Sequence, residues 1–196
     1  MKKVIPEDSI LVPDQAKRVF RGQIFDVYQW PQTMFDGSEA TFEMLKRPDT
    51  VVAICVIDDK IFVIDDEQPH TGVRQGFPGG RVDESDDSTK AAAKREVLEE
   101  TGYSFENWRL IKVWQPHSKI EWFVHIFVAS NVLDRQAPAV DAGEKITTRQ
   151  VAFDELRSQA INKTSFHSDT SKILENAESL EQLLSLAEFK GQSVDR

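Results

Sequence analysis

The sequence predicts an α+β fold, because short apolar runs typical of strands outnumber the segments with helical periodicity. The β-branched run at residues 51–57 is typical of a buried strand. Residues 88–101 form the one clear helix of the middle region, and residues 154–161 and 171–187 read as helices nearer the end. Strands with few, separated helices indicate the α+β class.

The first 47 residues are predicted to form an antiparallel β-element. Residues 17–30 contain two short strands broken at Gly22. Asp36-Gly37 is a strong hairpin turn, and residues 40–45 form the returning strand.

Residues 48–187 are predicted to form the main domain, which ends in a C-terminal helix, and residues 188–196 a tail. Asp58-Asp59 is predicted to form a turn that connects the strand at 51–57 to a second hairpin arm at 60–64. The glycine- and proline-rich stretch 72–80 is predicted to be loop. Later strands are expected at residues 108–114, 120–129 and 145–153.

The middle helix carries start and stop signals. Asp86, Asp87 and Ser88 offer capping oxygens and favourable charge at its beginning, and Gly102 is placed to end it.

The composition of the chain limits where the protein is expected to act and which ligands it is expected to bind. The chain has 196 residues, a formal net charge of −9 and a single cysteine, Cys55. No apolar run approaches the roughly 18 residues that a membrane span needs, and one cysteine suits a reducing compartment, so we expect a cytoplasmic protein. The negative charge disfavours binding of long nucleic acid. It does not exclude a small phosphorylated substrate, because bound Mg²⁺ can supply local positive charge.

Three carboxylates gather on the middle helix. Glu96, Glu99 and Glu100 fall within an arc of roughly 100° on a helix of 3.6 residues per turn. Like charges at this spacing repel by about 0.2–0.5 kcal/mol per pair. A hard divalent cation with oxygen ligands would offset that repulsion, and the paired glycines upstream would let backbone approach the ion or a phosphate.

This segment resembles the signature of the Nudix hydrolases, a glycine loop followed by a helix carrying Arg-Glu-(apolar)-x-Glu-Glu-x-Gly. Residues 95–103, REVLEETGY, fill the second half without a mismatch. The first half departs in two ways. The family's acidic residue falls on Asp87, where glutamate is usual, and Gly80 fits the opening glycine only if the loop holds one extra residue. The resemblance implies a Nudix-type α/β/α sandwich.

The resemblance also implies a Mg²⁺ site, in which Mn²⁺ can substitute. Glu96 and Glu100 would be the principal ligands, Glu99 would join them or hold a bridging water, and the carbonyl of Gly79 would be the non-carboxylate ligand. Arg95 would orient a carboxylate such as Glu99 within the catalytic site; the alternative is a simple exposed ion pair between them.

The catalytic base is expected in a loop after the helix. Glu144 is the first choice and Asp141 the second, and either could instead be an ordinary turn residue.

Residues 20–45 resemble the N-terminal β-element of ADP-ribose and related nucleoside diphosphate sugar pyrophosphatases, which are commonly homodimers. The resemblance therefore implies a homodimer, in which this element can form the interface. Gly80 and Arg74 are candidate phosphate contacts, although a lone loop arginine is often solvated. Trp30 is a candidate platform for the base or sugar, with packing in the core or dimer as the alternative.

The sequence thus predicts Mg²⁺-dependent hydrolysis of a pyrophosphate bond in a small nucleoside diphosphate derivative. ADP-ribose or an NDP-sugar is the favoured substrate, giving a nucleoside monophosphate and a sugar phosphate. The alternatives are hydrolysis of other Nudix substrates, such as a nucleoside triphosphate or a dinucleotide, and a ligand-sensing domain of this fold without catalysis.

Overall fold

The computed structural model describes residues 2–69, 72–140, 143, 145–161 and 168–195. Thirteen strands and four helices are assigned within these ranges. The strands are β1 (Lys2–Ile5), β2 (Lys17–Arg21), β3 (Asp26–Thr33), β4 (Glu39–Lys46), β5 (Thr50–Ile57), β6 (Lys60–Gln68), β7 (Gly72–Gly76), β8 (Gly79–Arg81), β9 (Tyr103–Trp114), β10 (Ile120–Glu121), β11 (Val124–Arg135), β12 (Lys145–Ala152) and β13 (Gln192–Asp195). The helices are α1 (Thr89–Thr101), α2 (Phe153–Ile161), α3 (Ser168–Asn176) and α4 (Leu180–Ser185). None of these helices is both long and apolar enough to cross a membrane.

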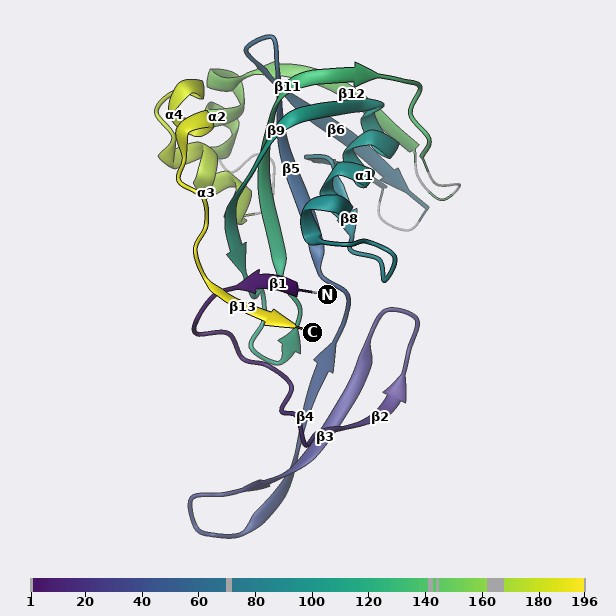
Figure 1. Ribbon diagram of the computed structural model, residues 1–196, viewed down its shortest axis with the longest axis vertical. Helices are drawn as coiled ribbons and strands as arrows, with labels where there is room; N and C mark the ends of the chain where they lie inside the picture. The colour runs from purple at the N-terminus through teal and green to yellow at the C-terminus, as the bar shows by residue number, and fades with distance from the viewer. Residues whose placement is uncertain (1, 70–71, 141–142, 144, 162–167, 196) are drawn as a thin grey trace.

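The main sheet is mixed, in the order β12-β6-β5-β11-β9, with β7 added beside β6 and β8 beside β5. Helix α1 lies on one face and helices α2, α3 and α4 lie on the other (Figure 1). Strand β5 contacts the helices on both faces of the sheet, because successive residues of a strand point to opposite faces. Ile54 and Val56 pack with α2, α3 and α4, whereas Val51 packs with Ala92 and Ala93 of α1. The predicted α/β/α sandwich of the α+β class is confirmed.

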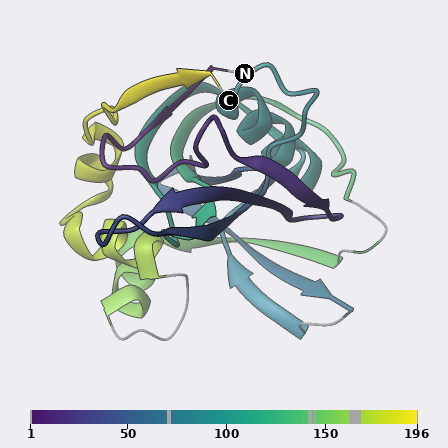
Figure 2. The ribbon, with the colours of Figure 1, turned by 90° about the horizontal axis from the view of Figure 1, so that it is seen from below.

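The N-terminal strands form a separate sheet in the order β10-β4-β3-β2, which projects from the end of the main sheet (Figures 1 and 2). Gly22 donates a backbone hydrogen bond to Phe25 in the turn between β2 and β3, so the predicted break at Gly22 is confirmed. The buried Glu121 of β10 links two strands of this sheet and holds the segment that precedes β2. Its carboxylate accepts from the Val12 backbone N–H at 2.8 Å and pairs with Lys46 Nζ at 2.7 Å.

Several predicted elements differ from the observed ones. The stretch 72–80, expected as loop, supplies β7, which pairs with the preceding strand β6, and most of β8, which pairs with β5. The expected helix at 171–187 is two helices, because Ser179 caps a new start at α4 by accepting from the Gln182 N–H. The expected strand 120–129 is split before Val124. Part of the expected C-terminal tail forms β13, which pairs antiparallel with β1 and brings the two ends of the chain together.

Candidate active site

A cavity of about 330 Å³ lies where β8 passes the carboxylate face of α1. Its lining includes the three helix glutamates and the glycines of β8, together with Arg47 and Ile24. Ala92, Ala93 and Val97 pack into the core, and Glu96 and Glu99 line the cavity from the later turns of the helix. Glu100 lies deeper and is 8% exposed.

The predicted helix boundaries are confirmed by the caps of α1. Ser88 Oγ accepts a hydrogen bond from the Ala91 N–H at 3.1 Å. Gly102 adopts a left-handed conformation, with φ of 76°, and its N–H donates to the Leu98 carbonyl. These two ends set the register of the helix and therefore the direction of its glutamates.

Two glycines of β8 allow the strand to approach both the sheet and the helix. Gly79 has φ of 156°, and a Cβ there would lie 2.1 Å from the Val51 carbonyl oxygen. A Cβ on Gly80 would lie 2.6 Å from both carboxylate oxygens of Glu96. The Gly79 N–H donates to Glu100 Oε2 at 2.8 Å. Gly79 is therefore required by its close contact with β5, and Gly80 by its close contact with Glu96.

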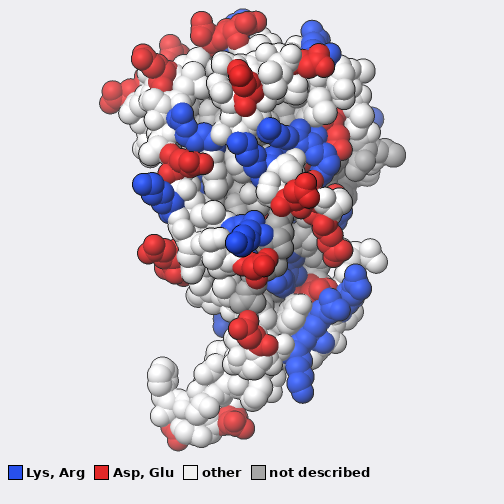
Figure 3. Space-filling view, in the orientation of Figure 1, with Lys and Arg blue, Asp and Glu red and all other residues white. Residues whose placement is uncertain are grey.

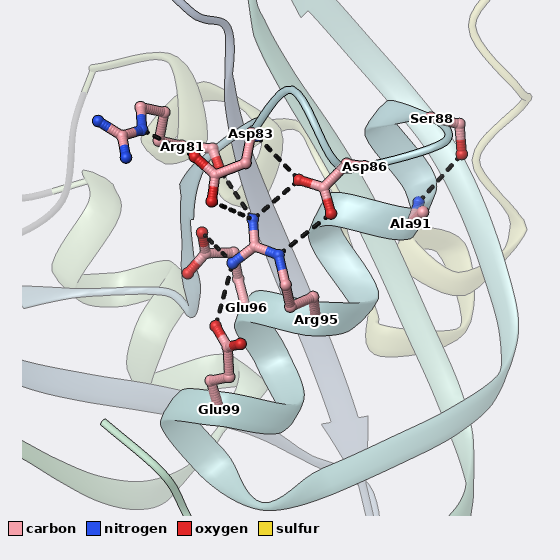
Figure 4. A network of polar contacts seen from close by, with 8 residues as sticks. All are labelled: Arg81, Asp83, Asp86, Ser88, Ala91, Arg95, Glu96 and Glu99. Atoms are coloured by element: carbon pink, nitrogen blue, oxygen red, sulfur yellow. Dashed lines mark hydrogen bonds and ion pairs between the residues drawn. The ribbon is translucent and has the colours of Figure 1, made fainter. Parts of the chain in front are cut away.

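Arg95 joins the helix to the preceding loop (Figure 4). Its Nη1 donates to Glu96 Oε1 and to Glu99 Oε2, each at 3.0 Å. Its Nε and Nη2 form a fork on the Asp86 carboxylate, at 3.1 and 2.9 Å, and Nη2 also donates to the Arg81 carbonyl. Arg95 is thus far more than an exposed partner of Glu99, because it holds two glutamates and the loop in one arrangement.

Asp86 is the loop acid that the sequence reasoning missed, since the family's pattern placed that residue at Asp87. The hydrogen bond from Arg95 lowers the pKa of Asp86, and that carboxylate in turn raises the pKa of Arg95. Sequence spacing alone could not choose between neighbouring aspartates, because the loop contains an extra residue relative to the family pattern.

The electrostatics of Glu96 favour a cation. Burial raises the pKa of Glu96, and the neighbouring charge of Arg95 opposes that rise without cancelling it. Within the described ranges, no three His, Cys, Asp or Glu side chains converge as a ready-made metal cage, since Arg95 draws Glu96 and Glu99 to itself. The donor set nevertheless fits Mg²⁺, because carboxylate and carbonyl oxygens are the ligands that this ion prefers.

A second cavity, of about 640 Å³, adjoins the first, and Arg47, Ile24, Arg81 and Asp83 line both. The Arg47 guanidinium carbon lies 4.5 Å from the Trp122 ring centroid and 5.5 Å from that of Phe25. Its Nε is buried without a hydrogen-bond partner in the described part of the chain. Sequence reasoning missed Arg47, because a single arginine before a strand has no specific signal.

Two predicted substrate residues do not line either cavity. Trp30 is 7% exposed and packs with Val12 and Met44 inside the N-terminal sheet, so its faces are not available for stacking on a ligand. Arg74 is exposed on β7, opposite Asp66 of β6. The two candidate bases, Glu144 and Asp141, lie outside the described residues.

Comparison with known proteins defines the class. The model of the NUDIX domain family matches residues 46–176 of the chain. The protein therefore belongs to the Nudix family, and the predicted class of pyrophosphohydrolase is confirmed. No curated protein matches the chain. A solved structure described as "Crystal structure of ADP compounds hydrolase" is similar over 93% of each chain, with a TM-score of 0.63 and 20% identity. At that identity the likeness concerns the fold.

Proposed function

We propose that the protein hydrolyses the pyrophosphate bond of a nucleoside diphosphate derivative, with ADP-ribose or an NDP-sugar as substrate and Mg²⁺ as cofactor. The observation that carries the proposal is the meeting of Glu96, Glu99 and Glu100 with the Gly79–Gly80 backbone at one cavity. The ADP compounds hydrolase whose fold this chain shares supports an adenosine diphosphate derivative.

The chain offers a defined set of metal ligands. Glu96 and Glu100 would hold the ion, Glu99 would complete the set directly or through water, and the Gly79 carbonyl would be the backbone ligand. When bound, Mg²⁺ neutralises charge on the phosphate oxygens and promotes the attack of water; Mn²⁺ can substitute. Arg95 keeps Glu96 and Glu99 in place through its two hydrogen bonds.

In the proposed reaction a water oxygen forms a bond to one phosphorus and the bridging P–O bond breaks. A loop carboxylate takes the proton of the water, and Glu144, with Asp141 as the alternative, stays the predicted base. The oxygen that leaves carries the second phosphate, so the products are a nucleoside monophosphate and a sugar phosphate.

Arg47 is proposed to contact the substrate where the two cavities meet. Arg47 lines both cavities, so a phosphate or sugar oxygen at their junction would accept a hydrogen bond from its guanidinium group. The lining of the larger cavity includes polar side chains such as Tyr28 and Asp26 of β3, which suits a hydroxyl-rich group. On the face shown in Figure 3, basic and acidic side chains are interspersed, which suits a small ligand better than a long polyanion.

The predicted homodimer is also part of the proposal. Several large apolar side chains are exposed around the N-terminal sheet: Val19, Phe20, Ile24 and Phe35. Their burial against a second copy would remove apolar surface from water. Sedimentation equilibrium on the full chain tests this association directly.

The proposed reaction is tested by incubating the protein and Mg²⁺ with ADP-ribose, ADP-glucose, UDP-glucose, NADH, diadenosine polyphosphates and nucleoside triphosphates, followed by identification of products. We expect Glu100→Gln to cut turnover by about 10²-fold or more, because it removes a metal ligand while its amide oxygen still accepts from the Gly79 N–H. Dominant triphosphate turnover would contradict the substrate assignment. Full activity of Glu100→Gln would contradict the metal site.

A further inference from the structure

Asp49 lies between the N-terminal sheet and the main sheet, and its carboxylate is almost fully buried. Its side chain is 3% exposed, and those of its partners Lys3 and His125 are 7% and 0% exposed. Lys3 Nζ donates to Asp49 Oδ2 at 2.7 Å, and His125 Nε2 lies 3.2 Å from the same oxygen. Burial opposes ionisation of Asp49, but His125 and Lys3 outweigh it and lower its pKa. The carboxylate is therefore a charged anchor inside the protein.

This anchor joins two segments that shape the site. Asp49 Oδ1 accepts from the Phe123 N–H at 3.0 Å, and the Asp49 carbonyl accepts from the Val82 N–H at 2.9 Å. The first bond holds the chain next to Trp122, and the second holds the chain that follows β8. Both segments are thus tied to one residue of the short connection between β4 and β5.

The same connection carries Arg47 two residues earlier. The Arg47 N–H donates to the Glu121 carbonyl, and its guanidinium lies over the Trp122 ring. Trp122 is itself fixed, because its Nε1 donates to Thr50 Oγ1 at 3.0 Å. Asp49 and Thr50 therefore hold residues 122–123 beside the connection, and the Arg47 guanidinium lies against the ring of Trp122.

We propose that Asp49 is a positioning residue that fixes the Arg47 guanidinium at the junction of the two cavities. Strand β1 helps to hold Asp49, because it carries Lys3, which donates to the Asp49 carboxylate. Strand β13 in turn pairs with β1. The two chain ends thereby support a substrate contact. The inference rests on the proposed function, which gives Arg47 its contact with the substrate.

A first experiment requires no turnover. The Arg47 Nε–H is buried, so its proton should exchange slowly with water, and nitrogen-15 NMR can measure this rate. In Asp49→Asn the amide can still accept from Phe123 but presents an NH₂ group to Lys3, and we expect the Arg47 Nε–H to exchange at least about tenfold faster. Unchanged exchange would overturn the positioning role, whether or not the enzyme hydrolyses any substrate.

A second experiment separates positioning from general stability. We expect Asp49→Asn to raise KM by about tenfold with little change in kcat, and to raise it no further in an Arg47→Ala background. If the double variant raised KM by the product of the two single effects, Asp49 would act independently of Arg47, and the proposal would be overturned. Asp65→Asn is the matched control, since it removes the carboxylate partner of Arg149 outside both cavities, and it should leave KM unchanged.

Lys3→Met keeps the test decisive if Asp49→Asn does not fold. Methionine retains an unbranched apolar chain near Phe123 and removes only the ammonium group that binds Asp49. We expect a rise in KM of about threefold, again absent in the Arg47→Ala background. If the wild-type protein hydrolyses none of the substrates, the proposed function fails, and the exchange experiment still decides the role of Asp49.

Discussion

Replacing Gly80 by alanine should damage the proposed metal site while sparing the fold. The added Cβ would lie 2.5 Å from the carboxyl carbon of Glu96 and 2.6 Å from each of its oxygens. To regain an ordinary van der Waals separation of about 3.4 Å, the Glu96 carboxylate has to move by about 0.9 Å. That movement also disturbs its hydrogen bond with Arg95.

The expected effect on catalysis is much larger than the effect on stability. A displacement of about 1 Å at a catalytic group can cost roughly 10²-fold in rate, so we expect kcat to fall by about that factor. The clash involves the end of a flexible side chain, and Gly→Ala also restricts the unfolded chain by about 0.4–1 kcal/mol. We therefore expect the free energy of unfolding to change by less than about 1 kcal/mol.

The assay compares Mg²⁺-dependent hydrolysis of the best substrate with urea unfolding for three alanine variants. Gly76→Ala is the matched control, because its Cβ would meet nothing within 4 Å; kcat should stay at the wild-type value, and the free energy of unfolding should rise by at most about 1 kcal/mol. Gly79→Ala should lower stability strongly, since its Cβ would collide with the Val51 backbone. If Gly80→Ala kept kcat within about twofold of wild type, the assignment of Glu96 as a metal ligand would be refuted.

The remaining predictions concern Arg95, Asp49 and Cys55. Arg95→Lys should lower kcat by about tenfold or more, because an ammonium group cannot fork onto Asp86 while holding two glutamates, and wild-type kcat would contradict that role. Asp49→Asn should lower the free energy of unfolding by about 3 kcal/mol at pH 7. Because the folded pKa of Asp49 is lowered, this difference should persist above about pH 4 and shrink as pH falls below it; urea titrations that show no such shrinkage would contradict the buried ion pair. Burial raises the pKa of the Cys55 thiol, so iodoacetamide should modify it only after unfolding, as mass spectrometry can show.

Local signals predicted the elements that depend on neighbouring residues. Helix α1 follows from a serine cap, a periodic apolar side and a terminal glycine, all within a few residues of the helix itself. The turn at Asp58-Asp59 was equally local, and both residues adopt positive φ. In these segments the sequence contains nearly all the interactions that decide the conformation.

Elements with a weak local signal, or with packing partners in other segments, were predicted poorly. Strand β7 has two glycines in five residues and looks like loop until it pairs with β6. The expected helix at 171–187 is interrupted where Ser179 caps α4 and Arg157 Nε of α2 donates to the Ala177 carbonyl. The sequence did not reveal that Trp30 is buried, because it packs against Val12 and Met44, which lie in other segments of the chain.

The sequence by itself determined the chemistry of the carboxylates. The spacing of Glu96, Glu99 and Glu100 follows from helical geometry and holds wherever the helix packs. Only the tertiary structure decided which other groups meet them: Asp86 rather than Asp87 on Arg95, and Arg47 between the two cavities. The physical reason is that a helix repeat is a local property of the backbone. The position of a loop carboxylate or a distant arginine depends on packing between segments that are far apart in the chain.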